Sequence, residues 1–289
     1  MPIGGQAVIE GVMMQNGRRV AVAVRTPGGE IALRDLERTR RFPKVSKIPF
    51  IRGPLRLYDI LSLGIRALNL SVELATEEEE ELGKWSKAVV TVGALALALG
   101  AFVVLPNFLA TFTQIPQRVL FNLAEGGIRV TVLLVYMFAI SRQRDIRRVF
   151  QYHGAEHKAV HAYEAGHGSS ASAARSHSPV HPRCGTAFLL MFVLVAVLVF
   201  SVLPAEPLWL RLLGRLALLP VVAGFTYEVL LLGGRHPRAL WLRPLLMPGL
   251  LLQRLLTTRE PTDDQLEVAV AALRHVTEDA APASLSTTP

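Results

Sequence analysis

The chain has 289 residues, of which 51% are hydrophobic and 19% charged, and its formal net charge is +8. The apolar residues lie in long runs with few charges, which excludes an ordinary soluble globular protein and indicates a membrane protein. The single cysteine, Cys184, excludes an intramolecular disulfide and suits a reducing compartment or a metal ligand.

The positive charge has a membrane explanation. The arginines of the chain are spread over several loops and are not gathered on one helix, so we expect no specific binding to nucleic acid. Lysine and arginine accumulate in cytoplasmic loops of membrane proteins, where they meet anionic lipids. Membrane lipids are therefore the expected partners of this charge.

Residues 1–45 predict a cytoplasmic β-rich region that folds as a small meander. Asn16-Gly17 and Pro27-Gly28-Gly29 are turn signals that separate apolar stretches. Glu10 lies inside the first stretch, either facing solvent or turned toward a site, and we favour the solvent-facing strand residue. The three expected strands are Gln6–Met14, Val20–Val24 and Ile31–Leu33.

Residues 46–84 predict an amphipathic interfacial region, with a helix over 54–81 that begins at Pro54. A wide apolar face and a narrow polar stripe suit a helix that lies on the membrane or packs against other helices. The acidic run Glu77–Glu81 predicts a solvated helix end. The stripe consists of Arg56, Asp59, Arg66, Asn69 and Glu73.

Residues 85–257 predict a transmembrane bundle with spans at about 88–110, 120–141, 185–203 and 210–233. The second span is weak, because Glu125, Gly126, Gly127 and Arg129 interrupt its start, so we expect it to be short, broken or partly interfacial. Basic residues concentrate in the N-terminal region, in the loop 142–184 and in the C-terminal tail. This alternation predicts a multi-pass protein of the inner (plasma) membrane with both termini cytoplasmic.

The remaining segments are short or irregular. Residues 238–257 are broken by Pro244 and Pro248-Gly249, so we expect them not to span but to lie at the interface or dip into the bundle. Gly166–Ser178 is rich in serine, alanine and glycine and is expected to be disordered. Residues 258–289 predict a cytoplasmic helix, opened by a capping box at Thr262–Gln265 and ending near Thr277, and then a disordered tail from 279. The fold class is mainly α, a polytopic membrane bundle of about four spans with a small N-terminal β-meander.

The stretch Tyr152–Glu164 carries the strongest chemical signal. Its histidines and acids recur every three or four residues, which places them on one face of a helix. His153, Glu156 and His157 match H-x-x-E-H, the inverted form of a zinc-protease signature. His161 and Glu164 extend the same face, and we expect this helix to continue from the inner end of the second span through Arg142–Phe150. A solvated helix with inert histidines is the competing interpretation, because so short a pattern also arises by chance.

Two other segments bring ligand-type residues to the same membrane end. His181 and Cys184 directly precede the third span, and Glu228 lies six residues before Gly234 near the end of the fourth. We expect a divalent metal, zinc before iron, on His153 and His157 with a third ligand from Glu228, His181 or Cys184. Glu156 is the expected general base. The alternatives are a salt bridge between Glu228 and an arginine of the inner loop, and a capping turn with an inert thiol at 181–184.

Four motifs together resemble the DUF1385 family, also called the YqhQ family, of bacterial membrane proteins. They are G-G-Q-A-V-I-E-G-V-M-M at 4–14, Y-H-G-A-E-H-K at 152–158, H-P-R-C-G-T-A-F at 181–188 and Y-E at 227–228. The resemblance covers about residues 2–275. It implies a membrane location and a dependence on metal, and it implies no substrate.

The site and the topology together predict a membrane-embedded zinc hydrolase, a protease being one form, with its site at the cytoplasmic membrane face. Its substrate would be a peptide bond in a membrane protein or a lipid-linked ester. One alternative is a non-catalytic scaffold or assembly factor with a structural metal. The other is an ion or metal transporter that uses Glu228 and the histidines, which four spans without an internal repeat support least.

Overall fold

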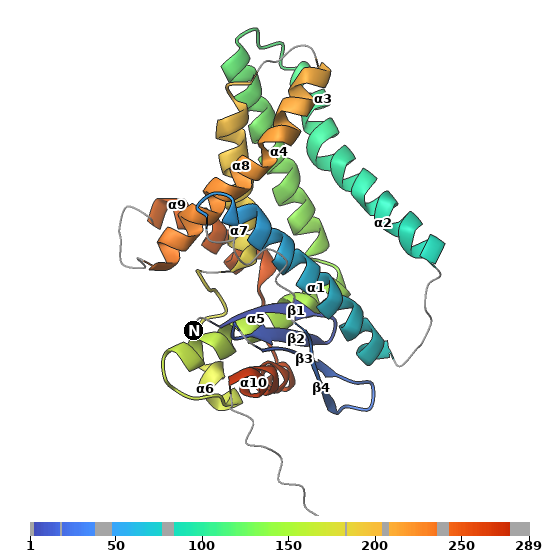
Figure 1. Cartoon of the computed structure of the whole chain (residues 1–289), viewed down its shortest axis with the longest axis vertical. Helices are drawn as coiled ribbons and strands as arrows, with labels where there is room; N and C mark the ends of the chain where they lie inside the picture. The colour runs from blue at the N-terminus through green and yellow to red at the C-terminus, as the bar shows by residue number, and fades with distance from the viewer. Residues whose placement is uncertain are drawn as a thin grey trace, which may run out of the picture.

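The N-terminal region forms one antiparallel sheet in the order β1-β2-β3-β4. The computed structural model describes residues 3–17, 19–37, 48–76, 84–182, 184–203, 208–235 and 243–277. Figure 1 shows the sheet below a taller group of helices, with β1 on the side nearest the helices and β4 farthest away. The expected meander is confirmed, with strands β1 (Gly4–Val8), β2 (Gly11–Gln15), β3 (Val20–Arg25) and β4 (Ile31–Asp35).

The first expected strand, Gln6–Met14, is wrong in one respect, because it is two strands joined by a tight turn at Ile9 and Glu10. Glu10 has a left-handed backbone with a φ of 51°, and its carbonyl accepts a hydrogen bond from the Arg25 amide at 2.9 Å. Its carboxylate pairs with Arg148 and accepts a hydrogen bond from the Tyr152 hydroxyl at 3.3 Å. Glu10 is therefore a turn residue tied to a neighbouring helix, and the expectation of a solvent-facing strand residue fails.

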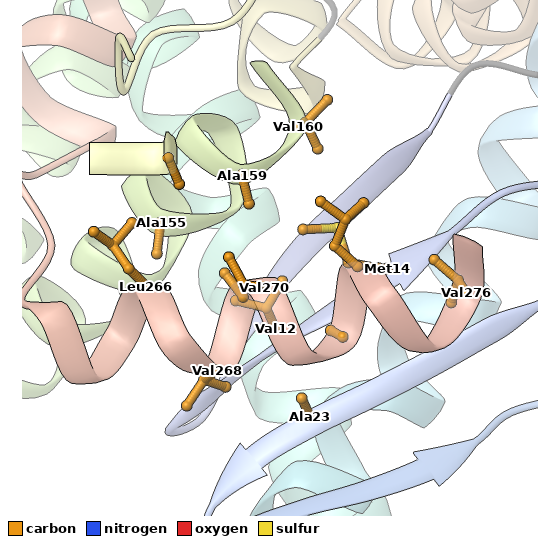
Figure 2. Close-up of a cluster of buried hydrophobic side chains, with 14 of the residues drawn as sticks. Val12, Met14, Ala23, Ala155, Ala159, Val160, Leu266, Val268, Val270 and Val276 are labelled. Atoms are coloured by element: carbon orange, nitrogen blue, oxygen red, sulfur yellow. The ribbon is translucent and has the colours of Figure 1, made fainter. Parts of the chain in front are cut away.

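Two helices cover one face of the sheet, α5 (Arg144–Glu164) and α10 (Asp263–Thr277). Figure 2 shows side chains from the sheet and from both helices meeting in one cluster. The small alanines on α5 let this helix approach the sheet closely. Burial of each large apolar side chain in the cluster contributes about 1.5–3 kcal/mol to the free energy of folding. The labelled members are Val12, Met14, Ala23, Ala155, Ala159, Val160, Leu266, Val268, Val270 and Val276.

Helix α10 begins as the sequence predicts. The side-chain oxygen of Gln265 accepts from the Thr262 amide at 3.0 Å, which is the return half of a capping box. The helix ends at Thr277, and its buried face lies in the core against β2 and β3. This helix is thus part of the hydrophobic core that supports α5.

The other face of the sheet is covered by α1 (Arg52–Thr76), which packs Leu63 and Ala67 against it. At its start, Gly53 meets Gly224 of a spanning helix so closely that a Cβ on Gly53 would lie 2.7 Å from the Gly224 Cα. A second face of α1 leaves large apolar side chains exposed, and the placement of this face on the membrane stays a prediction. These are Tyr58, Ile60, Leu61, Ile65, Leu68 and Val72.

Three helices are long and apolar enough to cross a membrane: Val89–Thr111, Arg118–Ile140 and Leu213–Gly233. The first is built from α2 (Lys84–Leu99), the π-helical turn η2 (Gly100–Val104) and α3 (Leu105–Thr111). The others are α4 (Arg118–Ile140) and part of α8 (Leu208–Arg235). The third expected span, 185–203, is the apolar helix α7 (Gly185–Phe200), whose 16 residues make it the shortest of the four.

The second span is not short or broken, contrary to the sequence prediction, because α4 is one continuous helix. The charges that interrupt its sequence are neutralised inside the bundle. Glu125 is fully buried and accepts hydrogen bonds from Arg129, at 2.6 Å, and from Arg215 of α8. Asn122 donates to the carbonyls of Ser201 and Leu203, both at 3.0 Å. Buried charges are tolerated in such a place when they are paired.

The connection from the second span to the His-rich helix also differs from the prediction. The sequence suggests one helix continuing through Arg142–Phe150, whereas α4 ends at Ile140 and α5 begins at Arg144. Gln143 has an extended backbone, with φ −71° and ψ 139°, so the chain turns there. This turn lets α5 leave the bundle axis and lie on the sheet (Figure 1).

Residues 166–178 are ordered, which corrects the prediction of disorder. They contain the helical turn α6 (Ala171–Arg175), in which the Ser170 side chain caps the Ala173 amide at 3.2 Å. Ala174 is fully buried in the cluster under α10, so packing compensates for a polar composition. The acidic run Glu77–Glu81 and the tail 279–289 lie outside the described residues.

After the fourth span, α9 (Arg243–Leu252) and the π-helical turn η4 (Gln253–Thr257) return along α7. A Cβ on Gly249 would lie 2.7 Å from the Ala187 Cβ, so the two helices touch at this glycine. With 10 and 5 residues, α9 and η4 together rise only about 22 Å at 1.5 Å per residue, which is too short to span a hydrocarbon core of roughly 30 Å. The segment from 243 to 257 thus packs beside α7, in agreement with the expectation that it does not cross.

Candidate metal centre

The turn of α5 over the sheet brings one face of the H-x-x-E-H pattern to the start of α7. His153 and His157 lie one helical turn apart on α5, and Cys184 is the N-cap residue of α7. All three side chains are buried, and one ligand atom from each lies within 4.8 Å of the others. Among the described residues, these three form the group of ligand-type side chains that could hold a metal ion.

Backbone carbonyls fix both imidazole rings. His153 Nδ1 lies 2.7 Å from the Thr257 carbonyl oxygen, and His157 Nδ1 lies 2.6 Å from that of Pro179. A carbonyl only accepts, so each Nδ1 carries a hydrogen, and in the neutral imidazole each Nε2 then offers its lone pair. Ligating histidines commonly hold their second nitrogen in this way. Both rings are therefore set in the tautomer that a metal site needs.

Cys184 completes the group from a different segment. His153 Nε2 lies 3.1 Å from its Sγ, and the Thr186 hydroxyl lies 3.1 Å from the same sulfur. The sulfur also accepts from the Thr186 amide at 3.4 Å, at the N-terminus of α7. The N-terminus of a helix attracts anions, so this is a favourable place for a thiolate ligand. The capping turn expected as an alternative is present, and it directs the sulfur toward His153.

Glu156 lies beside this group, and its side chain is buried. Burial raises its pKa to about 7, and its Oε2 lies 3.6 Å from His157 Nε2. A carboxyl group with this pKa is present in both protonation states near neutral pH, as a general acid and base requires. The position and the burial of Glu156 both suit a proton-transfer role.

Sequence reasoning missed a residue of the site, Gly5 of β1. A Cβ at this position would lie 2.6 Å from the Glu156 Cγ and 2.8 Å from its Oε1. Glycine is thus the only residue that lets the strand pass this close to the carboxylate. The Gly-Gly pair that opens the chain was the available signal, but nothing local indicates which distant side chain it faces.

His181 lies next to the group of three without belonging to it. Its ring centroid is 5.6 Å from that of His157 and 4.6 Å from that of His161. Its Nε2 lies 3.5 Å from a carboxylate oxygen of Glu164, and its amide donates to the Gln253 side chain at 2.9 Å. The outer histidines and Glu164 therefore form a polar extension of the site toward the exposed end of α5.

Glu228 lies in a different environment. Its carboxylate forms an ion pair with Arg52, whose Nε lies 2.7 Å from Oε1, and it accepts from the Phe50 amide at 3.2 Å. The close packing of Gly53 on Gly224 sets the start of α1 beside this part of α8. The structure brings Cys184 to the two histidines and pairs Glu228 with an arginine, as the alternative expected, but this arginine is Arg52 at the start of α1 and not one of the loop 142–184.

Comparison with known proteins agrees with the motifs. A family model described as "Protein of unknown function (DUF1385)" matches residues 48–279. The "Uncharacterized protein YqhQ" of Bacillus subtilis (strain 168) is 37% identical over 296 residues, covering 94% of this chain and 91% of that protein. No solved structure gives a significant match.

Proposed function

The chain belongs to the DUF1385 family, and from this premise we propose that it is a membrane-embedded, zinc-dependent hydrolase. His153, His157 and Cys184 hold the metal in this proposal, and Glu156 is the general base. Three protein ligands leave one position of a tetrahedral zinc site open, which distinguishes a catalytic site from a closed structural one.

The observation that carries the proposal is the orientation of the two imidazoles. Each donates its Nδ1 hydrogen to a backbone carbonyl and turns Nε2 toward a buried group that includes a thiol. Two nitrogens and a sulfur are a donor set that zinc favours. In a tetrahedral site with zinc–nitrogen and zinc–sulfur bonds of usual length, neighbouring ligand atoms are about 3.5 Å apart. The His153 Nε2 to Cys184 Sγ distance of 3.1 Å is near that value.

The chain's own residues supply the proton transfers. When bound, zinc acts as a Lewis acid and makes a nearby water more acidic. The ionised Glu156 accepts a proton from the water that attacks the carbonyl carbon of an amide or ester. It then returns this proton to the departing nitrogen or oxygen as the bond from the carbonyl carbon breaks. One water is consumed, and an acid and an amine or alcohol are released.

The substrate class follows from where the group lies. Cys184 caps a helix of the spanning bundle, while His153 and His157 come from the helix on the sheet, so the group sits where the two parts meet. The bond to be hydrolysed at this position therefore belongs to a membrane protein or to a lipid-linked ester. We take this end as cytoplasmic in the plasma membrane, because the basic loops accumulate there.

The test is metal analysis of purified protein together with a catalytic readout. Wild type should hold about one zinc per chain, and His157→Ala should lose it, whereas the exposed His167→Ala should keep it. Glu156→Gln should retain the metal and lose function in a complementation assay. A wild-type protein without stoichiometric metal would overturn the proposal.

A non-catalytic scaffold with a structural metal is the second candidate. It is favoured by the observation that the group joins two segments, α5 and the start of α7, which a metal would hold together. If the metal is only structural, Glu156→Gln would complement fully, whereas His157→Ala would fail to complement. The same two variants therefore separate the two functions.

A further inference from the structure

We infer that the protein binds an extended peptide along the free edge of β1, and that this main-chain pairing carries the peptide past Glu156. The inference rests on the proposed function, because it names the substrate class of the same site. It selects a peptide over a lipid-linked ester, since an acyl ester offers no row of main-chain donors and acceptors.

The hydrogen-bond pattern of the sheet identifies the free groups. The Arg25 amide donates to the Glu10 carbonyl, so residue 10 of the β1–β2 hairpin points toward β3. Peptide groups alternate sides along an antiparallel strand, so 12 and 14 also point to β3 while 11, 13 and 15 point to β1. Their partners in β1 are Val8, Gln6 and Gly4. The peptide groups of Gly5 and Ala7 therefore point outward.

These outward groups have no partner within the part of the chain that the structure describes. β1 is the first strand of the sheet, so no described strand pairs with its outer side. Both residues are partly buried and not fully covered, and β1 carries no charge or proline of the kind that blocks pairing in natural sheets. Figure 1 shows this edge on the side of the sheet that faces the spanning helices.

The position of the edge connects it to the chemistry. An added strand would lie about 4.8 Å from β1. A Cβ on Gly5 would lie 2.6 Å from the Glu156 Cγ, so a strand paired at Gly5 passes next to the carboxylate. Main-chain pairing gives affinity without requiring a particular sequence, as in other cases of strand addition. An extended peptide segment leaving the membrane would thus be held with its amide bonds beside the general base.

The experiment measures fluorescence anisotropy with the full chain in detergent micelles. The probe is a fluorescein-labelled peptide of alternating valine and threonine with a lysine at each end. The rise on mixing reports docking, and any later decay reports cleavage. A second probe is the same peptide with every other amide N-methylated, which removes donors from one edge. We expect the methylated probe to bind wild type at least about tenfold more weakly.

Two proline variants locate the binding edge. Ala7→Pro replaces an outward N–H and leaves the ladder to β2 intact, and it should weaken docking at least about tenfold. Asp35→Pro places proline at an outward position of β4, on the opposite edge, and should leave docking unchanged. Zinc content should be equal in wild type and both variants, which checks that the fold survives.

Each outcome decides one question. The inference would be overturned by any one of three results. These are equal binding of the two probes to wild type, equal binding of the unmethylated probe by Ala7→Pro and wild type, and no docking to wild type at all. If Ala7→Pro fails to fold, the comparison of the two probes on wild type still decides. Docking without any later decay would refute the hydrolase and leave the peptide-binding edge standing. Docking retained by His157→Ala, the variant that should lose its zinc, would support binding by the edge of β1 itself and not by the metal.

Discussion

The substitution Gly5→Ala tests the link between the sheet and the candidate centre most directly. The new Cβ would lie 2.6 Å from the Glu156 Cγ, 2.8 Å from its Oε1 and 2.9 Å from its Cδ. A contact at the limit of ordinary packing is 3.4 Å, so the side chain or the strand must move by 0.8 Å, the difference between 3.4 and 2.6. Glu156 is buried, which leaves the displaced carboxylate little room.

A displacement of about 1 Å in a catalytic group costs on the order of 100-fold in rate. Overpacking of a buried site costs roughly 1–3 kcal/mol of folding free energy. We therefore expect Gly5→Ala to keep its zinc, to unfold at a modestly lower temperature and to cleave the peptide probe about 100-fold more slowly. Docking should change little, because a Cβ at this position points to the face of the sheet and not to its edge.

The matched control is Gly4→Ala, whose new Cβ would lie 3.6 Å from the Gln15 side chain, an ordinary contact. Cleavage rates, zinc content and thermal unfolding are measured on both variants. Wild-type cleavage by Gly5→Ala would refute the reasoning, since it would mean that the placement of Glu156 against β1 has no role in the reaction.

Three further predictions address the metal, the bundle and the site helix. Cys184→Ser should lower zinc affinity at least about tenfold in a chelator competition, because a hydroxyl is a poorer zinc ligand than a thiolate. Glu125→Gln leaves two arginines without their carboxylate and should lower the free energy of unfolding by about 3–5 kcal/mol. The control Glu267→Gln removes a surface ion pair and should lower it by less than about 1 kcal/mol. Equal melting temperatures of the two variants would contradict this prediction. Gly154→Ala places a Cβ 2.1 Å from a backbone carbonyl and should abolish folding measured by proteolysis, while Gly28→Ala, with its nearest atom at 3.8 Å, should fold normally.

Local patterns were sufficient for the elements and for part of the site. The spacing of His153, Glu156 and His157 is a property of one helix, so the sequence alone places them together. Asn16-Gly17 marks the β2–β3 turn, and Thr262–Gln265 marks the start of α10. The apolar runs identify the spanning helices, because a helix in lipid must satisfy its own main chain and expose apolar side chains.

Local patterns failed where a distant partner changes the outcome. The charges at the start of the second span predict a broken helix, but Arg215 of another helix pairs with Glu125 and the helix is continuous. The composition of Gly166–Ser178 predicts disorder, but Ala174 finds a place in the core. In both cases the compensating contact lies far away in the sequence.

The amino-acid order is enough to identify the chemistry available to this protein: a membrane chain, a helix with two histidines and a glutamate on one face, and three further ligand-type residues at the same membrane end. Which of these residues meet depends on the packing of distant segments. This packing turned Cys184 toward His153, set Glu228 against Arg52 and brought Gly5 against Glu156. The reason is physical: spacing within a helix is fixed by 3.6 residues per turn, whereas contacts between segments depend on packing of whole faces, which no single segment encodes.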